Sequence, residues 1–322
     1  MKPLFFLLST IGLSLSSPLA LANKAADYPS HPLRLVVPHG PGGVADTVSR
    51  VIGDALAKEL KQAVVIENKA GASTMIGADF VAKAAPDGYT MLMASVTTLS
   101  INHHLYPNIS YQPDRDFAPV SMVAETPFYL LASPTLKVNT VSELIELARK
   151  NPGKFNYSTP GNGTSPHLVS ELFTSLAGID VIHVPYKSTS AAEVDLNAGR
   201  IQFAFTGSGA QAIRSGRVIG LGLTSEQPIS AMPELQPLQS QGVDLTAAVW
   251  NGIVVPTGTD PAIIDKLSKA IETVTQQAEV KSKLEATGAI VYGTTPEAFK
   301  KMIGEESARW GEVIKKANIT VQ

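Results

Sequence analysis

Four loops rich in Gly, Ser and Thr contain the residues of this sequence that could bind a charged small molecule. Each follows a short apolar run that is typical of a buried strand, and helical spacing of apolar residues resumes after it. The first N–H groups of a helix lack partners within it, and its dipole favours an anion there. Many neutral donors and little fixed charge indicate a carboxylate. The loops are 38–46, 95–100, 159–167 and 185–190.

The candidate ligand-binding residues lie in these loops. Helix capping requires the same residue types, so a purely structural role for any single loop remains the alternative. Four such loops in one chain make a shared anion-binding cleft a serious hypothesis. The candidates are His39, Gly42, Gly43, Asp46, Ser95, Thr97, Asn162, Gly163, Thr164, Ser165, His167, Tyr186, Ser188 and Thr189.

Asp46 lies in the first turn of an expected helix over residues 44–60 and allows two interpretations. Its carboxylate could face the cleft and order a water molecule or a donor of the ligand. Alternatively, an acidic residue in the first turn pairs with helix N–H groups, and Arg50 lies at i+4. We favour the structural role, although the two roles are compatible.

Signals for enzyme chemistry are weak. The segment 207–212 matches G-x-G-x-x-A, but the next strand is expected near Val218, which leaves too short a helix for a dinucleotide site. His103 and His104 are adjacent, so we expect them to point in different directions rather than to form a metal pair. We therefore predict no catalytic residue, metal or cofactor. An exported hydrolase or isomerase that uses His39 or His167 as a base is the alternative.

The first 22 residues resemble a targeting segment. Lys2 precedes an apolar stretch over 4–15, and Ala20-Leu21-Ala22 fits a signal-peptidase site. We expect a cleaved signal peptide over 1–22, a mature chain that starts near Asn23, and export to the periplasm. The remaining 300 residues contain no further apolar run long enough to span a bilayer.

The composition excludes several classes of protein. The chain has no cysteine, so disulfide bonds, thiolate metal sites and a catalytic thiol are absent. Without Lys2, 25 basic residues stand against 28 acidic residues, a formal net charge of −3. This near-neutral balance argues against nucleic acid as a partner.

The expected elements alternate between strands and helices, which predicts an α/β fold with parallel sheets. The pattern occurs twice, before residue 120 and after residue 150, and the chain closes with helices near 261–277 and 296–316. We predict two lobes joined by two crossing strands, with hinges near 124–127 and 248–252. Lobe 1 would comprise 23–125 plus 250–322, and lobe 2 would comprise 126–249. The cleft between them is the expected ligand site.

An ordered set of segments resembles the Bug (TctC-like) periplasmic solute-binding proteins, from about Tyr28 to Ile319. The segments are Pro38 to Asp46, Val65 to Ala72, Ala85 to Thr90, Asp116 to Val120, Tyr157 to His167, and His183 to Lys187. The resemblance implies a Venus-flytrap fold of the periplasmic binding protein type II kind. It also implies capture of small organic carboxylates for tripartite tricarboxylate transporters, which have two membrane subunits. The family's carboxylate-binding loops would fall on 39–46, 161–167 and 186–189.

Three departures from the family pattern concern the ligand. His39 stands where an aromatic residue is common, and Ser188 replaces a Gly. A strand that often ends in Asp ends here at Thr206, which joins the candidate site residues. The missing acid makes a mono- or dicarboxylate a better candidate than an amino acid. We expect a monomer, and a sensory subunit that presents its ligand to a receptor remains an alternative role.

Overall fold

The computed structural model describes residues 27–186, 189–316 and 319–320, and for residues 189 and 190 it describes the backbone alone. The expected signal peptide and the candidate residue Ser188 lie outside the described residues. Within the described residues, no helix is both long and apolar enough to cross a membrane.

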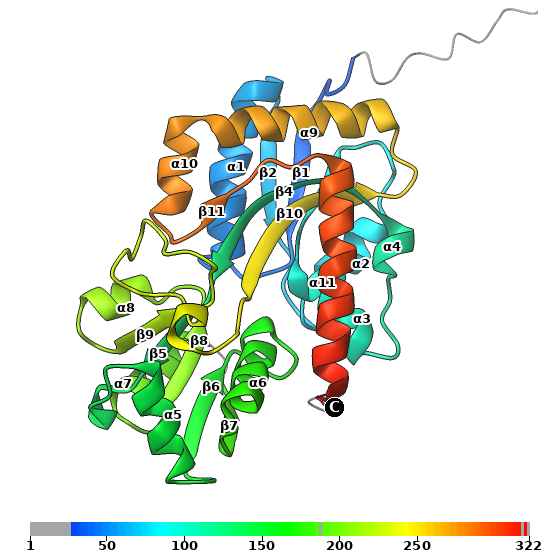
Figure 1. Cartoon of the computed structure of the whole chain (residues 1–322). Helices are drawn as coiled ribbons and strands as arrows, with labels where there is room; N and C mark the ends of the chain where they lie inside the picture. The colour runs from blue at the N-terminus through cyan, green and yellow to red at the C-terminus, as the bar shows by residue number, and fades with distance from the viewer. Residues whose placement is uncertain (1–26, 187–188, 317–318, 321–322) are drawn as a thin grey trace, which may run out of the picture.

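Two β-sheets form the centres of two lobes, one above the other in Figure 1. The six-stranded sheet has the order β11-β4-β10-β3-β1-β2. Its strands are β1 (Leu33–Val37), β2 (Val64–Asn68), β3 (Thr90–Ser95), β4 (Phe117–Pro127), β10 (Ala248–Pro256) and β11 (Ile290–Val291). The five-stranded sheet has the order β7-β6-β8-β5-β9. Its strands are β5 (Tyr129–Ala132), β6 (Phe155–Thr159), β7 (Val181–Pro185), β8 (Phe203–Thr206) and β9 (Ile219–Leu223).

Both sheets are mixed, so the expectation of parallel sheets is only partly right. β1 is parallel to β2 and β3, and β6 is parallel to β7 and β8. β10 is antiparallel to β3 and β4, and β5 is antiparallel to β8 and β9. These antiparallel pairs form where the chain crosses between the lobes. β4 leads directly into β5 with no crossover helix, and β10 returns the chain to the six-stranded sheet.

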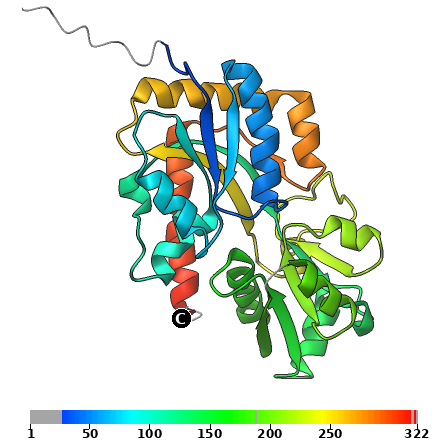
Figure 2. The same ribbon diagram turned by 180° about the vertical axis from the view of Figure 1, so that it is seen from behind.

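Helices cover both faces of each sheet (Figures 1 and 2). Side chains alternate along β1: Leu35 and Val37 pack toward α1 and α9, whereas Val36 belongs to the cluster that contains α2 and α11. In the other lobe, α5 and α6 pack on one face of the sheet and α7 and α8 on the other. The longer helices are α1 (Val44–Leu60), α2 (Met75–Ala82), α5 (Val141–Arg149), α6 (Ser165–Ala177), α7 (Thr189–Asn197), α9 (Pro261–Gln276), α10 (Ala278–Glu285) and α11 (Pro296–Lys316).

The remaining helical segments are short. They are the π-helix η1 (Thr97–Ile101), α3 (Asn102–Leu105), α4 (Pro113–Asp116), the 3-10 turns η2 (Pro134–Leu136) and η3 (Gln239–Gln241), and α8 (Ala210–Arg214). The π-helix follows β3 directly and contributes to the edge of the first lobe that faces the second.

β4 and β10 connect the lobes, as expected from the sequence, and Thr224 ties them together where they leave the six-stranded sheet. The Thr224 hydroxyl donates to the Ala247 carbonyl at 2.5 Å and accepts from the Phe128 N–H at 2.7 Å. Its backbone bonds the same two residues, because Thr224 N donates to Phe128 O and Ala247 N donates to Thr224 O. One residue therefore holds both connections in register.

Candidate functional site

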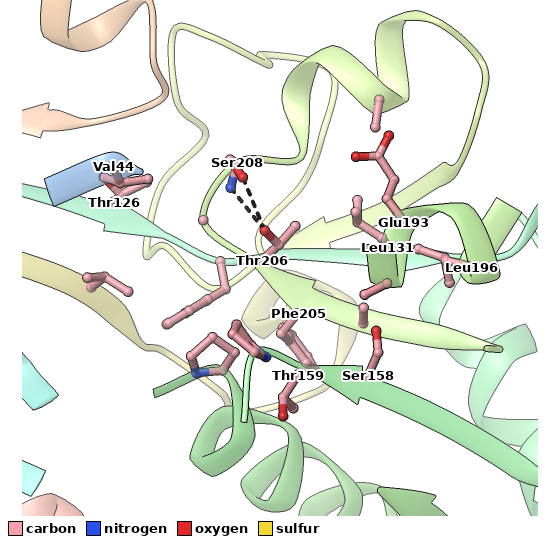
Figure 3. Close-up of a pocket in the computed structure, with 18 of the residues that line it drawn as sticks. Val44, Thr126, Leu131, Ser158, Thr159, Glu193, Leu196, Phe205, Thr206 and Ser208 are labelled. Atoms are coloured by element: carbon pink, nitrogen blue, oxygen red, sulfur yellow. Dashed lines mark hydrogen bonds between the residues drawn. The ribbon is translucent and has the colours of Figure 1, made fainter. Parts of the chain in front are cut away.

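A cavity of about 180 Å³ lies between the two lobes. The first lobe contributes Gly43 and Val44 at the start of α1, and the crossing strands contribute Thr126 and Val249 where they pass between the lobes. The rest of the wall comes from the second lobe. Figure 3 shows Val44 and Thr126 on one side of this cavity and the ends of β6 and β8 below them.

Neutral donors and acceptors, together with one carboxylate, form the polar part of the wall. The polar side chains are Thr126, Ser158, Thr159, Thr206, Ser208 and Glu193. Ser208 N donates to Thr206 Oγ1 at 3.3 Å, and the two hydroxyl oxygens lie 3.4 Å apart (Figure 3). The loop after β8 is therefore folded so that two hydroxyls are presented together.

The starts of α1 and α6 carry no side-chain cap. Gly43 and Thr164 precede these helices in an extended conformation, and neither makes a capping hydrogen bond. In contrast, Thr140 Oγ1 caps α5 and Asp260 Oδ1 caps α9, both away from the cavity. The starts of α2 and α10 also lack side-chain caps, but neither helix lines the cavity. What sets α1 and α6 apart is therefore that their uncapped starts lie beside the cavity. The first-turn N–H groups of both helices lack partners within the helix, which favours an anion, except that Pro166 at the start of α6 has no N–H.

Asp46 organises the loop before α1. Oδ2 accepts from Gly42 N at 2.9 Å and from Arg50 Nε at 3.0 Å. Oδ1 accepts from Arg50 Nη2 and Asn68 Nδ2, both at 2.9 Å. Burial disfavours the charge, but these hydrogen bonds outweigh it and lower the pKa of Asp46 to about 2. A carboxylate has about four acceptor positions, and all four are occupied by the protein.

His39 sits in the same loop, and it does not line the cavity. Its backbone carbonyl accepts from Asn68 Nδ2 at 3.0 Å, while its Nε2 is buried with no hydrogen-bond partner among the described residues. Burial lowers the pKa of His39, which favours the neutral ring.

Two stacked histidines support the loop 159–165 from inside the second lobe. Gly163 N donates to His167 Nδ1 at 3.1 Å, and His183 Nε2 lies 2.6 Å from Thr159 Oγ1. The two rings stack with centroids 4.1 Å apart, and Tyr157 stacks on His183 while its hydroxyl donates to Glu171. Burial lowers the pKa of both histidines to about 4, with a smaller contribution at His183 from His167. Both rings are therefore neutral at pH 7.

The structure places the candidate residues in three groups. Gly43 and Thr206 line the cavity itself. Thr97 Oγ1 and Ser165 Oγ lie 3.5 Å apart and form a contact between the lobes. The others lie in the surrounding loops. Gly42 bonds to Asp46 before α1, and before α6 Gly163 bonds to His167 and Thr164 bonds to Gly161 in the loop that also contains Asn162. Ser95 contacts Thr98, Tyr186 donates to Asp195, and Thr189 is the first residue of α7.

Several cavity residues were missed in the sequence. Ser158, Thr159 and Ser208 stand at or just after strand ends, so the strand-end argument could have included them. Glu193, Leu196 and Leu131 could not be found in that way. They lie within α7 and β5, where apolar periodicity indicates a core and does not reveal a cavity.

A larger hollow of about 550 Å³ lies on the opposite face of the crossing strands. Glu125 and Trp250 line it, whereas their neighbours Thr126 and Val249 line the interlobe cavity, as expected for residues that alternate along a strand. Three carboxylates surround this hollow, from Glu125, Glu226 and Glu306. Burial and the two other carboxylates raise the pKa of Glu125. Arg309 also lines the hollow, but it pairs with Glu306 at 2.9 Å. The remaining negative charge makes this hollow less suited to an anion than the interlobe cavity.

Two sequence motifs have structural explanations. His103 and His104 were expected to diverge, but both Nε2 atoms approach Ser307 Oγ, at 2.9 and 3.1 Å. The short helix α3 packs against α11, and this packing draws both rings to one hydroxyl. The described residues contain no group of three or more potential metal ligands. The helix in the G-x-G-x-x-A segment, α8, has only five residues, so the expectation that it is too short for a dinucleotide motif is met.

Comparison with known proteins gives a consistent result over nearly the whole chain. A family model described as "Tripartite tricarboxylate transporter family receptor" matches residues 48–319. Protein BugT of Bordetella pertussis is 34% identical over 314 residues, which cover 96% of each chain.

Solved structures of similar proteins share the fold. The structure of R. palustris Rpa4515 with adipate has a TM-score of 0.85 at 30% identity and covers 91% of this chain and 99% of that one. The periplasmic binding protein BugD has a TM-score of 0.81 at 30% identity, covering 92% and 100%. MatC from Rhodopseudomonas palustris with bound malate has a TM-score of 0.79 at 29% identity, covering 89% and 100%. The predicted two-lobed α/β fold is confirmed.

Proposed function

The chain belongs to the tripartite tricarboxylate transporter receptor family, as its Bug-like segments predicted, and from this premise we propose that it captures a small organic carboxylate between its lobes and delivers it to membrane subunits. The family consists of solute-binding receptors. We propose that this chain, too, binds its solute without chemical change, and that it acts as a monomer.

One observation carries this proposal: the starts of α1 and α6, on opposite sides of the cavity, both lack side-chain caps. Gly43 and Val44 line the cavity from one lobe, and Pro166 lines it from the other. Two helix dipoles directed at one cavity favour an anion more than either one alone. Among the residues that the structure describes, the surrounding wall supplies hydroxyl groups and no Lys or Arg. Such a wall suits a carboxylate held by neutral donors.

The ligand chemistry agrees with that of similar proteins. The structures with adipate and with malate both contain a small organic acid. Thr206, rather than an acid, ends β8 beside the cavity, and the Glu193 carboxylate that does line the cavity is already paired with Arg217, so a positively charged amine has less to bind there. For this reason we propose a mono- or dicarboxylate rather than an amino acid.

The proposed mechanism is closure of two lobes around the ligand. We assign residues 23–125 and 250–322 to lobe 1 and residues 126–249 to lobe 2, with the crossing strands β4 and β10 as the hinge. Closure brings the start of α1 against the loop after β6, which surrounds the carboxylate and removes water from it.

Native mass spectrometry of the purified protein, followed by a thermal-shift screen of mono-, di- and tricarboxylates and amino acids, tests the proposal. A binding acid at 100 times its Kd stabilises the folded state by about 2.7 kcal/mol. No stabiliser in the whole panel, with ligand-free protein confirmed, contradicts the proposal. Recovery of a chemically altered compound after incubation contradicts the non-enzymatic part of it.

Export is a separate part of the proposal. We propose that residues 1–22 are removed and that the mature protein starts near Asn23 in the periplasm, where BugD, a periplasmic binding protein, offers a parallel. N-terminal sequencing of protein released from the periplasm by osmotic shock tests this. An intact Met1 on the released protein contradicts the assignment.

A further inference from the structure

The cavity extends from the interlobe surface into an apolar end inside the second lobe. The cavity is lined by four large apolar side chains that are each at most 3% exposed: Phe128, Leu131, Leu196 and Phe205. In Figure 3, Leu131 and Leu196 lie at the end away from Val44 and Thr126, with Ser158 providing a hydroxyl beside them. The start of α1 is therefore at one end, the hydroxyls of Thr206 and Ser208 lie between the ends, and mostly hydrocarbon is at the other end.

The size of the cavity suits a compact apolar group. An apolar cavity of roughly 150 Å³ accepts a benzene ring, and this cavity measures about 180 Å³. Native interiors are close-packed, and an unfilled apolar cavity of this size is destabilising. A ligand whose ring or alkyl chain fills it removes that defect.

Glu193 is the charged side chain at the apolar end (Figure 3). Its carboxylate pairs with Arg217 at 3.2 Å, and Arg217 is itself 53% exposed and does not line the cavity. The positive charge therefore lies toward the solvent, and the negative charge lies toward the cavity. Glu193 Oε1 is buried, although 26% of the side chain as a whole is exposed, so a second carboxylate on the ligand would approach it in a partly desolvated place, where like charges repel.

We propose that the ligand is a monocarboxylate with an apolar chain or ring, and that Glu193 discriminates against dicarboxylates. The carboxylate binds at the starts of α1 and α6, and the hydrocarbon occupies the space between Leu131 and Leu196. This proposal rests on the proposed function and narrows it, and it sets this chain apart from the adipate- and malate-bound structures.

Hexanoate and adipate test the proposal, because the two acids have the same six-carbon chain and differ only at the far end. In titration calorimetry with the full mature protein, we expect hexanoate to bind at least tenfold more tightly than adipate. We also expect affinity to rise about fourfold for each methylene added from butanoate to hexanoate, as burial of a methylene predicts. Phenylacetate and 4-carboxyphenylacetate repeat the comparison with a ring, because the second carboxylate is again at the far end.

Two variants assign the discrimination to Glu193. Glu193→Gln removes the charge at nearly constant shape, so adipate affinity should rise at least fivefold while hexanoate affinity changes less than twofold. Arg217→Gln breaks the same ion pair but keeps the carboxylate, so adipate affinity should not rise. An equal gain for adipate in both variants attributes the effect to the broken ion pair and overturns the role of Glu193.

The failures of the two proposals are distinguishable. Adipate that binds as tightly as hexanoate, or affinity that does not increase with chain length, overturns the monocarboxylate proposal and leaves carboxylate capture intact. Absence of binding by every mono-, di- and tricarboxylate overturns both. The chain-length series uses the wild-type protein, so it decides the matter even if a variant fails to fold.

Discussion

At the scale of single residues, Asp46 illustrates how an acidic residue beside a cleft can act by shaping a loop. Its two oxygens accept four hydrogen bonds, from Gly42, Asn68 and twice from Arg50. These bonds hold Gly42 and Gly43 in place at the start of α1. The role that we propose for Asp46 in ligand binding is therefore indirect: it fixes the position of the backbone N–H groups beside the cavity.

Replacement of Asp46 by Asn should lower the free energy of unfolding by about 1–2 kcal/mol at pH 7, because a buried charged hydrogen-bond network is broken. The folded-state pKa of about 2 is below the ordinary value of 3.8. The stabilisation is thus complete above pH 4 and disappears as the pH falls from about 4 to about 2. Urea denaturation of both proteins across this range should show the difference shrinking.

Asp54→Asn is the control for this measurement, since Asp54 is exposed on the same helix. It should change the free energy of unfolding by less than 0.5 kcal/mol, roughly the range of surface substitutions. A difference between wild type and Asp46→Asn that stays constant down to pH 2 contradicts the assigned role.

Gly42 and Gly43 should respond differently to the same added methyl group. Gly42 has a φ of +84°, so Ala should cost about 1–2 kcal/mol of folding stability. Gly43 has a φ of −80°, which Ala adopts freely, and a methyl group on its Cα would meet nothing from the second lobe within 4 Å. Gly43→Ala should fold normally and weaken carboxylate binding about tenfold by crowding the cavity.

Thermal denaturation and calorimetry with the tightest-binding carboxylate separate the two effects. If Gly43→Ala binds as well as wild type, the carboxylate does not approach the start of α1. That result would remove the main support for the proposed binding mode.

The residue types in the sequence were enough to locate the loops, but not the depth of the cavity. Gly43 could be chosen because a glycine between a strand and a helix allows close approach to the backbone, whereas Thr206 was indicated by its departure from the family pattern. The spacing of apolar residues around Leu131 and Leu196 is the same whether these side chains pack in a filled core or line a cavity. Glu193 could not be predicted as a site residue either, because the direction of its side chain depends on how α7 packs against the five-stranded sheet.

At the scale of elements, the loop before α6 depends on two neutral histidines. His167 Nδ1 can accept from Gly163 N only while that nitrogen carries no proton. His183 stacks directly on His167, so a charge on either ring is unfavourable for the other. Acid should therefore loosen this loop.

The folded-state pKa of about 4 for His167 lies below its ordinary value of 6.5. The unfolded chain therefore binds more protons between these two values, and the free energy of unfolding falls as the pH drops from about 6.5 to about 4. We expect a loss of roughly 1–3 kcal/mol attributable to this residue over that range. His167→Asn, whose side-chain oxygen can replace Nδ1 as acceptor, should show a shallower dependence in urea denaturation.

His31→Asn serves as the matched control, because His31 is exposed and far from the cavity. It should follow the wild-type curve. Equal slopes for wild type and His167→Asn between pH 6.5 and 4 would mean that His167 does not carry the effect.

Thr224 offers a second test at this scale, at the junction of β4 and β10. Thr224→Val retains the shape but leaves the buried Phe128 N–H and Ala247 carbonyl without their side-chain partner. The expected cost is about 1–3 kcal/mol in the free energy of unfolding. Thr224→Ser keeps the hydroxyl and should cost clearly less. Similar losses in both variants would indicate that the methyl group, rather than the hydroxyl, matters.

At the scale of the whole molecule, alternation of strands and helices correctly predicted two α/β lobes. It did not predict that both sheets are mixed, because strand direction depends on where the chain crosses between lobes. β4 is continuous with the turn into β5, so β5 enters its sheet without the crossover helix that makes strands parallel. A local pattern cannot contain this information, since it depends on how the two lobes are joined.

The contact between Thr97 and Ser165 allows lobe closure to be measured. Their hydroxyl oxygens are 3.5 Å apart although they belong to different lobes, and the chain has no native cysteine. In the variant Thr97→Cys/Ser165→Cys, a disulfide should form when the lobes close. A saturating carboxylate that favours the closed form should increase the rate of disulfide formation at least threefold, because the rate follows the closed population.

Gel shift under non-reducing conditions measures this rate, and the single variants Thr97→Cys and Ser165→Cys control for bonds between molecules. The oxidised double variant should also release bound carboxylate at least tenfold more slowly than the reduced form, because the ligand is enclosed. If the carboxylate binds but leaves the rate of disulfide formation unchanged, the two lobes do not close on it. Capture would then depend on the loops alone, and the crossing strands β4 and β10 would connect the lobes without acting as a hinge.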